Sequence, residues 1–281
     1  MAQQILHLQA PAKINLHLRI TGRRPDGYHL LDSRMQKLEF CDELAFERLD
    51  RGIELVCAGR AVPVGPENLV WRAAALFFAE TRADFGVRIT LRKHIPVAAG
   101  LGGGSSDAAA TLRALLRLSG LRMPRAQQLA LALRLGADVP FFMQDAPAAL
   151  ARGVGEMLQP VAPLVGPAVL LVHPGVSVST KWVYQSLDLT SQALDDSFQR
   201  SAGGGQSCPF VNDLEPVTVS RYPVVGELKA EMAGLGAEPA LMSGSGATVF
   251  GLFADREQAK RAFLHFQGIY AHTYLTRPLS G

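Results

Sequence analysis

Residues 98–111 read AAGLGGGSSDAAAT, and no other stretch of the chain constrains the fold as strongly. Four glycines and two serines fall within the seven positions 100–106. Because glycine loses more conformational freedom on folding than any other residue, such a run indicates a tight turn or a ligand held close to the backbone. The alanines that follow favour a helix, predicted over residues 104–118 and entered at Ser105 or Ser106.

The glycines precede a helix N-terminus, where backbone N–H groups lack partners and carry partial positive charge. A phosphate group could therefore approach these N–H groups closely. Two common nucleotide motifs are excluded, since no Gly-Lys-Ser/Thr closes the run and Ser105 stands where G-x-G-x-x-G needs its last glycine. The alternative is an ordinary loop with a serine cap. Asp107 adds a difficulty, because its charge repels an anion unless it points aside or meets a cation.

Strands and helices are predicted in irregular order along the rest of the chain, which is typical of an α+β fold. Alternating polarity or a short apolar run predicts strands at residues 13–20, 87–91 and 168–172, and two short strands around a glycine turn within 239–253. Helical spacing of apolar residues predicts helices at 67–82, 125–135, 222–233 and 256–266, with Gly136 as a C-cap.

A length of 281 residues favours two domains. Residues 153–167 are rich in glycine, proline and valine, and a new strand is predicted directly after them. We therefore expect a boundary near residue 160, with domains at 1–160 and 161–281. Residues 188–209 have low hydrophobicity and contain three consecutive glycines, which is typical of a mobile surface loop.

Composition excludes several classes of protein. The net charge is only +3 and no long Lys/Arg run occurs, so no nucleic-acid partner is expected. Three cysteines without metal-ligand spacing predict reduced thiols rather than a disulfide framework. No stretch has the pattern of a signal peptide, and the apolar runs are too short to span a bilayer, so we expect a cytoplasmic protein with no membrane partner.

Three stretches, in order, resemble the motifs of the GHMP kinase superfamily, which includes galactokinase, homoserine kinase and mevalonate kinase. They are APAKINL at residues 10–16, PVAAGLGGGSSDAAA at 96–110 and LMSGSGAT at 241–248. The resemblance implies ATP with Mg²⁺ and the two-domain GHMP kinase fold, with an N-terminal domain like ribosomal protein S5 domain 2 and a ferredoxin-like C-terminal domain. It places the active site between the domains, in a monomer or homodimer. The ATP-binding residues that it implies are Pro96, Gly100, Leu101, Gly102, Gly103, Gly104, Ser105 and Ser106, with Asn68 and Lys93 lining the nucleotide pocket.

Four further stretches are similar to one branch of the superfamily, which phosphorylates the 2-hydroxyl of a cytidine diphosphate alcohol in non-mevalonate isoprenoid synthesis. They are KIN at residues 13–15, PDGYHLL at 25–31, GADVPFF at 136–142 and NDLE at 212–215. The resemblance implies Lys13 and Asp138 as the catalytic pair, with Asp138 as general base and Lys13 holding it ionised. Asn15 shares the strand face of Lys13, and a hydrogen bond to the substrate is expected there.

A cytosine ring needs an aromatic face and a hydrogen-bonding edge, which Tyr28 and His29 offer. The resemblance implies a second aromatic residue, for which Tyr184 matches best and Trp182 is the alternative. The remaining substrate-binding residues that it implies are Thr180, Gly244, Ser245 and Gly246. Two other readings stay open: a mevalonate- or homoserine-type kinase, which needs no aromatic pair for a base, and a catalytically silent nucleotide-binding regulator, against which the retention of Lys13 and Asp138 argues.

Overall fold

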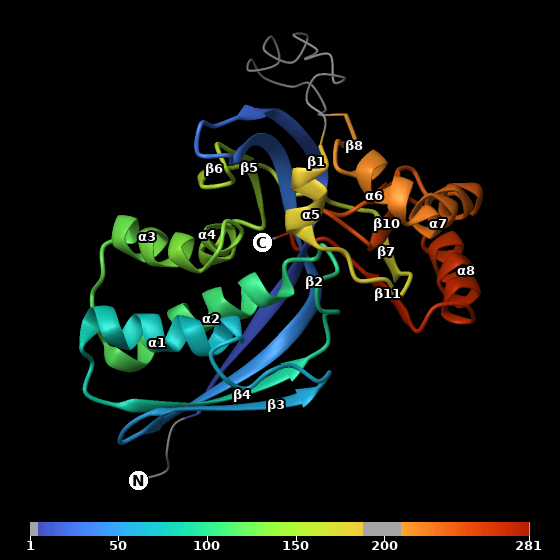
Figure 1. The fold of residues 1–281 in the computed structure, drawn as a ribbon. Helices are drawn as coiled ribbons and strands as arrows, with labels where there is room; N and C mark the ends of the chain where they lie inside the picture. The colour runs from blue at the N-terminus through green and yellow to red at the C-terminus, as the bar shows by residue number, and fades with distance from the viewer. Residues whose placement is uncertain (1–4, 188–208, 281) are drawn as a thin grey trace. The chain divides into compact units, whose positions relative to one another are not determined.

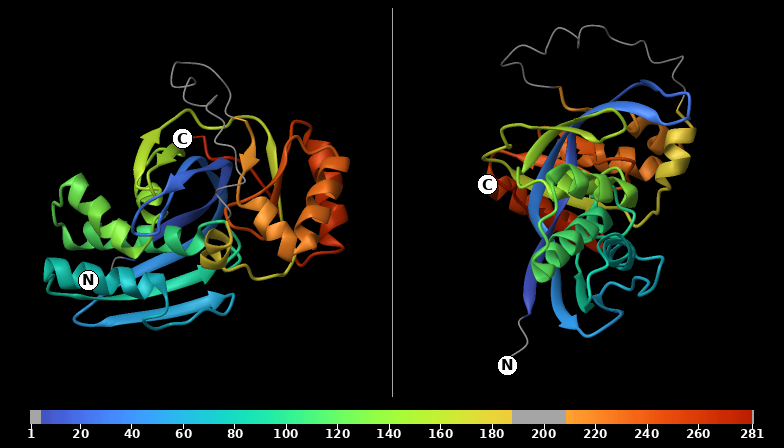
Figure 2. Two further views of the ribbon diagram at one scale, coloured as in Figure 1. Left: turned by 45° about the horizontal axis from the view of Figure 1, so that its top comes forward. Right: turned by 90° about the vertical axis from the view of Figure 1, so that its left-hand side faces the viewer.

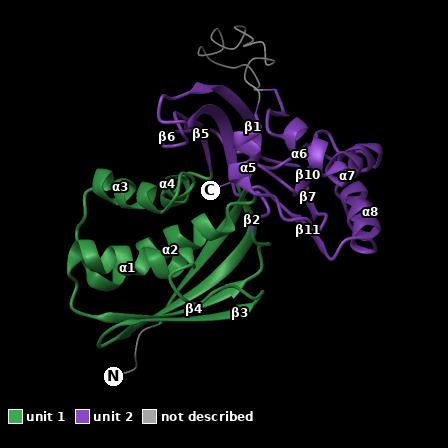
Figure 3. Cartoon of the chain, in the orientation of Figure 1, with its two compact units in different colours: residues 1–13, 37–97, 101–147 green, residues 14–36, 98–100, 148–281 purple. Residues whose placement is uncertain are grey.

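The computed structural model describes residues 5–187 and 209–280, which form an α+β fold of eleven strands and eight helices (Figure 1). The loop predicted at residues 188–209 lies almost entirely outside the described residues. The chain divides into two compact units (Figure 3). The first contains the residues up to 13, 37–97 and 101–147, and the second contains 14–36, 98–100 and the residues from 148 onward.

The two long strands explain why this division differs from a single boundary near residue 160. Strand β1 (Leu6–Arg23) passes from the first unit into the second, and β2 (His29–Leu49) passes back. The chain also enters the second unit briefly at residues 98–100, within the glycine-rich stretch, and then returns to the first. Residue 160 itself lies at the end of β6 (Met157–Pro160), inside the second unit.

The first unit is a sheet covered by helices. The strands run in the order β3 (Ile53–Gly59), β4 (Gly86–Lys93), β2 and β1, with β3 parallel and β2 antiparallel to β4. Helices α1 (Leu69–Thr81), α2 (Gly103–Ser119) and α3 (Arg125–Leu135) lie on one side of β3 and β4 (Figure 2). The predicted strand at 87–91 and all three predicted helices are confirmed to within about two residues.

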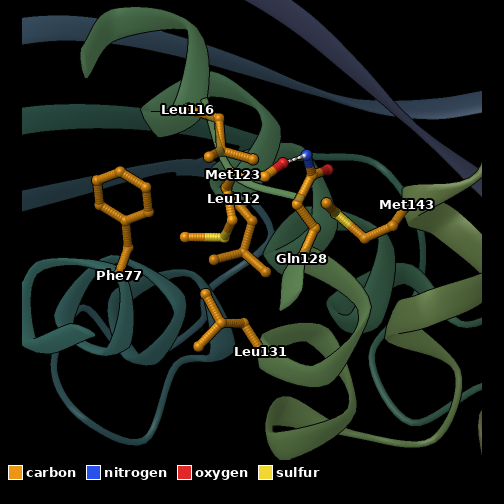
Figure 4. Close-up of a pocket in the computed structure, with 7 residues that line it drawn as sticks. All are labelled: Phe77, Leu112, Leu116, Met123, Gln128, Leu131 and Met143. Atoms are coloured by element: carbon orange, nitrogen blue, oxygen red, sulfur yellow. Dashed lines mark hydrogen bonds between the residues drawn. The ribbon is translucent and has the colours of Figure 1, made fainter. Parts of the chain in front are cut away.

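These helices and the short α4 (Val139–Met143) pack through apolar side chains. A small pocket among them is lined by Phe77, Leu112, Leu116, Met123, Gln128, Leu131 and Met143 (Figure 4). The only polar side chain of the lining, Gln128, donates from Nε2 to the Met123 carbonyl at 2.8 Å. Because no lining side chain is ionisable, this pocket is a packing feature of the helix layer.

The second unit has its own antiparallel sheet, in the order β11 (His272–Thr276), β7 (Ala168–His173), β10 (Val249–Phe253) and β9 (Ala240–Met242). Helices α7 (Pro223–Gly234) and α8 (Arg256–Gln267) contribute buried Met232 and Phe266 to the same apolar cluster as Val172 and Phe253. The strands and helices predicted for this region are confirmed. The shorter elements β5 (Ala148–Arg152), β6, α5 (Thr180–Gln185), β8 (Val211–Asn212) and α6 (Glu215–Arg221) were not predicted.

Candidate active site

The glycine-rich stretch forms a turn that leads directly into α2, but the helix begins at Gly103 and not at Ser105 or Ser106. Gly102 is the N-cap residue, with φ 68°. This left-handed conformation is the one that glycine adopts without strain, so the glycine takes the place of a capping serine. A Cβ atom on Gly102 would lie 3.0 Å from the Lys13 Cγ atom, and one on Gly103 would lie 2.9 Å from the Lys93 Nζ atom. Neighbouring side chains therefore fill the space that a larger residue would need.

The first turn of α2 presents backbone donors. The Ser106 N–H donates to the Gly102 carbonyl at 2.9 Å, which is the first hydrogen bond of the helix. Helix geometry leaves the N–H groups of Gly103, Gly104 and Ser105 without partners inside the helix, and about half a unit of positive charge gathers there. Gly104 is exposed, so this turn suits an anion such as phosphate.

Lys13 packs directly against this turn. Its backbone N–H donates to the carbonyl of Leu101 at 2.9 Å, and its side chain is 5% exposed. The Lys13 Nζ atom lies 3.7 Å from Oδ2 of Asp138, whose side chain is 36% exposed. Asp138 precedes α4 at its N-cap position, but its carboxylate makes no capping bond. A buried ammonium group thus lies beside a carboxylate that is open to solvent, next to an anion-binding turn.

Asn68 and Lys93 have structural partners in the first unit. Asn68 caps α1, accepting at Oδ1 from the Val70 N–H at 2.9 Å. Lys93 is buried and donates to both Asp42 and Asp107, the latter at 2.7 Å. Asp107 therefore pairs with a cation, but it shares that cation with Asp42. The nucleotide contacts that the resemblance implies for Asn68 and Lys93 stay predictions.

The predicted cytosine-binding residues lie in the second unit. Tyr28 is 65% exposed. The rings of His29 and Tyr184 are 5.4 Å apart between centroids and tilted by 40°. Burial, followed by the charge of Arg23, lowers the pKa of His29, so its imidazole is neutral near pH 7 and can both donate and accept.

Trp182 has other neighbours than Tyr184. The Arg221 guanidinium lies over the Trp182 ring at 4.6 Å, and the Tyr222 ring is 6.3 Å away, edge on. Trp182 thus has a cation–π contact and an aromatic neighbour of its own. Of the two aromatic residues weighed for the second face of the base, Tyr184 is thus the one beside His29.

The turn at residues 243–248 is held by polar side chains of the second unit. Asn212 donates from Nδ2 to the carbonyls of Met242 and Gly244, at 2.8 and 2.7 Å. Thr180 shares a hydrogen bond of 2.8 Å with the Ser245 hydroxyl. The Ser243 hydroxyl donates to the Gly100 carbonyl at 3.0 Å, which joins this turn to the start of the glycine-rich stretch. Asn15 is buried and donates to the Ser33 hydroxyl at 2.8 Å.

Two further buried polar residues were not predicted, one in each unit. Thr218 donates to the Ser245 carbonyl at 3.1 Å. Lys37 is buried on β2, and its Nζ atom donates to the carbonyl of Gln144, directly after α4. Burial lowers the pKa of Lys37 to about 8. A lysine within a strand gives no signal by itself, since such residues are usually solvated.

Family models match both parts of the chain. The GHMP kinases N terminal domain matches residues 68–152, and the GHMP kinases C terminal domain matches residues 194–271. The chain belongs to the GHMP kinase family. It is an ATP-dependent kinase, and the predicted fold is confirmed.

Several individual proteins are similar to nearly the whole chain. Over 260 residues, 92% of this chain, it is 46% identical to the 4-diphosphocytidyl-2-C-methyl-D-erythritol kinases of Geobacter metallireducens and Geobacter sulfurreducens, covering 92% and 93% of those proteins. A crystal structure of 4-(cytidine 5′-diphospho)-2C-methyl-D-erythritol kinase matches with a TM-score of 0.84 and 36% identity, covering 98% of this chain and 100% of that one. The homoserine kinase of Cytophaga hutchinsonii matches with a TM-score of 0.75 at 19% identity, covering 100% of this chain and 96% of that one, which shows the fold alone. No described helix has the length and apolarity that a bilayer span needs.

Proposed function

We propose that the protein transfers the γ-phosphoryl group of ATP to the 2-hydroxyl of 4-diphosphocytidyl-2-C-methyl-D-erythritol, a step of non-mevalonate isoprenoid precursor synthesis. The observation that carries the chemistry is the Lys13–Asp138 pair, 3.7 Å apart, beside the first turn of α2. The substrate follows from the relatives named above, together with His29 and Tyr184 as neighbouring rings.

Phosphoryl transfer depends mainly on positioning and on stabilisation of negative charge. In this proposal the N–H groups of Gly103, Gly104 and Ser105 hold phosphate oxygens of ATP. Such donors are fixed before the reaction, so no reorganisation is needed when charge develops. The Lys13 side chain packs against Gly102. In this proposal its ammonium group stabilises the negative charge that develops on the transferring phosphoryl group.

Asp138 acts as the general base. Its carboxylate accepts the proton of the substrate hydroxyl as the hydroxyl oxygen attacks the γ-phosphorus, and the bond to the bridging oxygen of ADP breaks. The exposed side of Asp138 leaves room for the alcohol. The Lys13 ammonium, 3.7 Å away, holds that carboxylate in place by attraction between opposite charges.

Mg²⁺ enters with ATP as part of the nucleotide substrate. The described residues contain no group of three or more His, Cys, Asp or Glu side chains that could hold a metal ion. Mg²⁺ is commonly bound by phosphate oxygens and water with few protein ligands. When bound, the ion neutralises charge on the phosphates.

Turnover with a panel of alcohols tests the substrate. We expect ADP release with 4-diphosphocytidyl-2-C-methyl-D-erythritol, and background rates with mevalonate and homoserine. Turnover of mevalonate or homoserine without turnover of the cytidine compound would reject the proposed substrate and favour the other kinase class. Nucleotide binding without turnover of any alcohol would favour a silent regulator.

Tyr184→Ala is expected to raise the KM for the cytidine substrate about tenfold, because stacking of a base on an aromatic ring contributes about 1–3 kcal/mol. The KM for ATP should not change. Trp182→Ala is the matched control, since Trp182 packs against Arg221 and Tyr222. Steady-state kinetics of both variants decide between the two residues, and a larger effect at Trp182 would reverse the assignment.

A further inference from the structure

Two buried carboxylates in the first unit share one ammonium group. Lys93 on β4 donates to Oδ2 of Asp42 on β2 and, at 2.7 Å, to Oδ2 of Asp107 on α2. None of the three side chains is more than 4% exposed. With all three groups ionised, this acidic cluster (Asp42, Lys93 and Asp107) carries a net charge of −1 away from solvent, where screening by water is weak.

The acidic cluster lies directly beneath the proposed phosphate-binding turn. The Lys93 Nζ atom is 2.9 Å from the position that a Cβ atom on Gly103 would take. Asp107 follows Gly103 by four residues on α2, a distance of about 6 Å along the helix axis. The Lys93 ammonium is thus the member of the cluster shown to lie at the turn, and the Asp107 carboxylate lies one helical turn behind it. Because one cation is shared by two carboxylates, a phosphate bound at the first turn still adds its charge to a cluster with a net charge of −1.

The two carboxylates differ in their partners. Oδ1 of Asp42 accepts from the backbone N–H groups of His94 and Ile95, at 2.6 and 2.9 Å, and Oδ2 accepts from Lys93, so both oxygens of this carboxylate have donors. Oδ1 of Asp107 is buried and has no hydrogen-bond partner among the described residues. An additional proton on the cluster therefore belongs on Asp107.

The titratable groups that face Asp107 are Asp42 and Lys93 within the cluster and the thiol of Cys57 on β3. Burial raises the pKa of Cys57, so the thiol stays neutral and does not compete for the charge of Lys93. Burial is also the main cause that raises the pKa of Asp107 to about 7, against the opposing effect of Lys93. Asp107 is thus partly protonated near neutral pH before any ligand binds.

We propose that binding of the ATP phosphates at the first turn of α2 is accompanied by uptake of a proton from solvent in those molecules in which Asp107 is still ionised. The bound anion disfavours the ionised carboxylate beneath it, and protonation reduces the charge of the cluster from −1 to zero. By linkage, the affinity for nucleotide must fall as Asp107 loses its proton with rising pH. This inference rests on the proposed function, because it takes the first turn of α2 as the phosphate site.

Calorimetry with Mg²⁺ and a non-hydrolysable ATP analogue tests the proposal. The binding enthalpy is measured near neutral pH in two buffers that differ in ionisation enthalpy, so that the difference reports the protons taken up. We expect uptake of up to about half a proton, because Asp107 is already partly protonated, and a Kd that rises about fivefold from about pH 6 to about pH 8. Asp107→Asn should abolish both effects, whereas Glu43→Gln, an exposed neighbour of Asp42, should keep them.

The outcomes distinguish the proton-uptake inference from the proposed nucleotide site. Equal proton uptake by the native protein and Asp107→Asn, or none by the native protein, would overturn the inference and leave the nucleotide site in place. Absence of analogue binding would remove the nucleotide site, and the inference with it. If Asp107→Asn does not fold, Asp42→Asn serves instead, since the remaining Lys93–Asp107 pair is then neutral with Asp107 ionised and proton uptake should be lost.

Discussion

Asp138→Asn is expected to lower kcat about 10³-fold and to leave the KM for ATP within about threefold of the native value. Asparagine keeps the shape of the side chain but can neither take the proton of the alcohol nor pair with Lys13 as an anion. The first turn of α2, which is proposed to hold ATP, is unchanged by the substitution. Steady-state kinetics with saturating ATP measure both parameters.

Asp145→Asn is the matched control for this variant. Asp145 lies seven residues further along the chain, its side chain is 98% exposed, and it pairs with Arg113 at 3.6 Å. Its replacement should leave kcat unchanged. If Asp138→Asn retained a kcat within tenfold of the native enzyme, Asp138 would not be the general base.

The second large effect concerns stability. Lys93→Met is expected to lower the free energy of unfolding by about 3–5 kcal/mol at pH 8, because it leaves two buried carboxylates without their cation. Denaturant unfolding measures the change. The loss should be smaller at about pH 5, where protonation of Asp107 removes part of the unpaired charge, since the pKa of that residue is raised by burial.

Two further variants separate charge from packing. Arg92→Met, at the exposed neighbouring position, should cost about 0–1 kcal/mol, as expected for a surface ion pair with Glu43. Adding Asp107→Asn to Lys93→Met should recover part of the lost stability. An equal loss for Arg92→Met and Lys93→Met, or no recovery in the double variant, would show that the acidic cluster carries no buried charge of consequence.

The sequence predicted those elements in which one physical signal dominates. Helix α3 has the bounds that apolar spacing predicted, with Gly136 as its C-cap. Strand β2 was not predicted, because Asp32, Gln36 and Asp42 interrupt its apolar pattern. These residues are nevertheless buried with distant partners: Asp42 with Lys93, and Gln36 with the carbonyl of Leu279 and the N–H of Leu164. Local pattern contains no information on such partners.

The N-terminus of α2 is a second feature that local sequence pattern did not predict correctly. Serine is a common N-cap, so the pattern favoured Ser105 or Ser106, but Gly102 takes that place through a positive φ angle. The pairing of Lys13 with Asp138 joins residues 125 positions apart, and only the family resemblance pointed to it. For Lys93, the resemblance implied a nucleotide contact and did not reveal its bonds to Asp42 and Asp107.

The site of phosphorylation on the product tests the central claim most directly. The native enzyme is incubated with Mg²⁺, ATP and 4-diphosphocytidyl-2-C-methyl-D-erythritol, and the product is analysed by phosphorus NMR and mass spectrometry. We predict one added phosphate, on the oxygen at C2, with one ADP formed for each product molecule. Phosphate on another hydroxyl, or ADP formed at the same rate without the alcohol, would contradict an alcohol activated at Asp138 beside ATP on the first turn of α2.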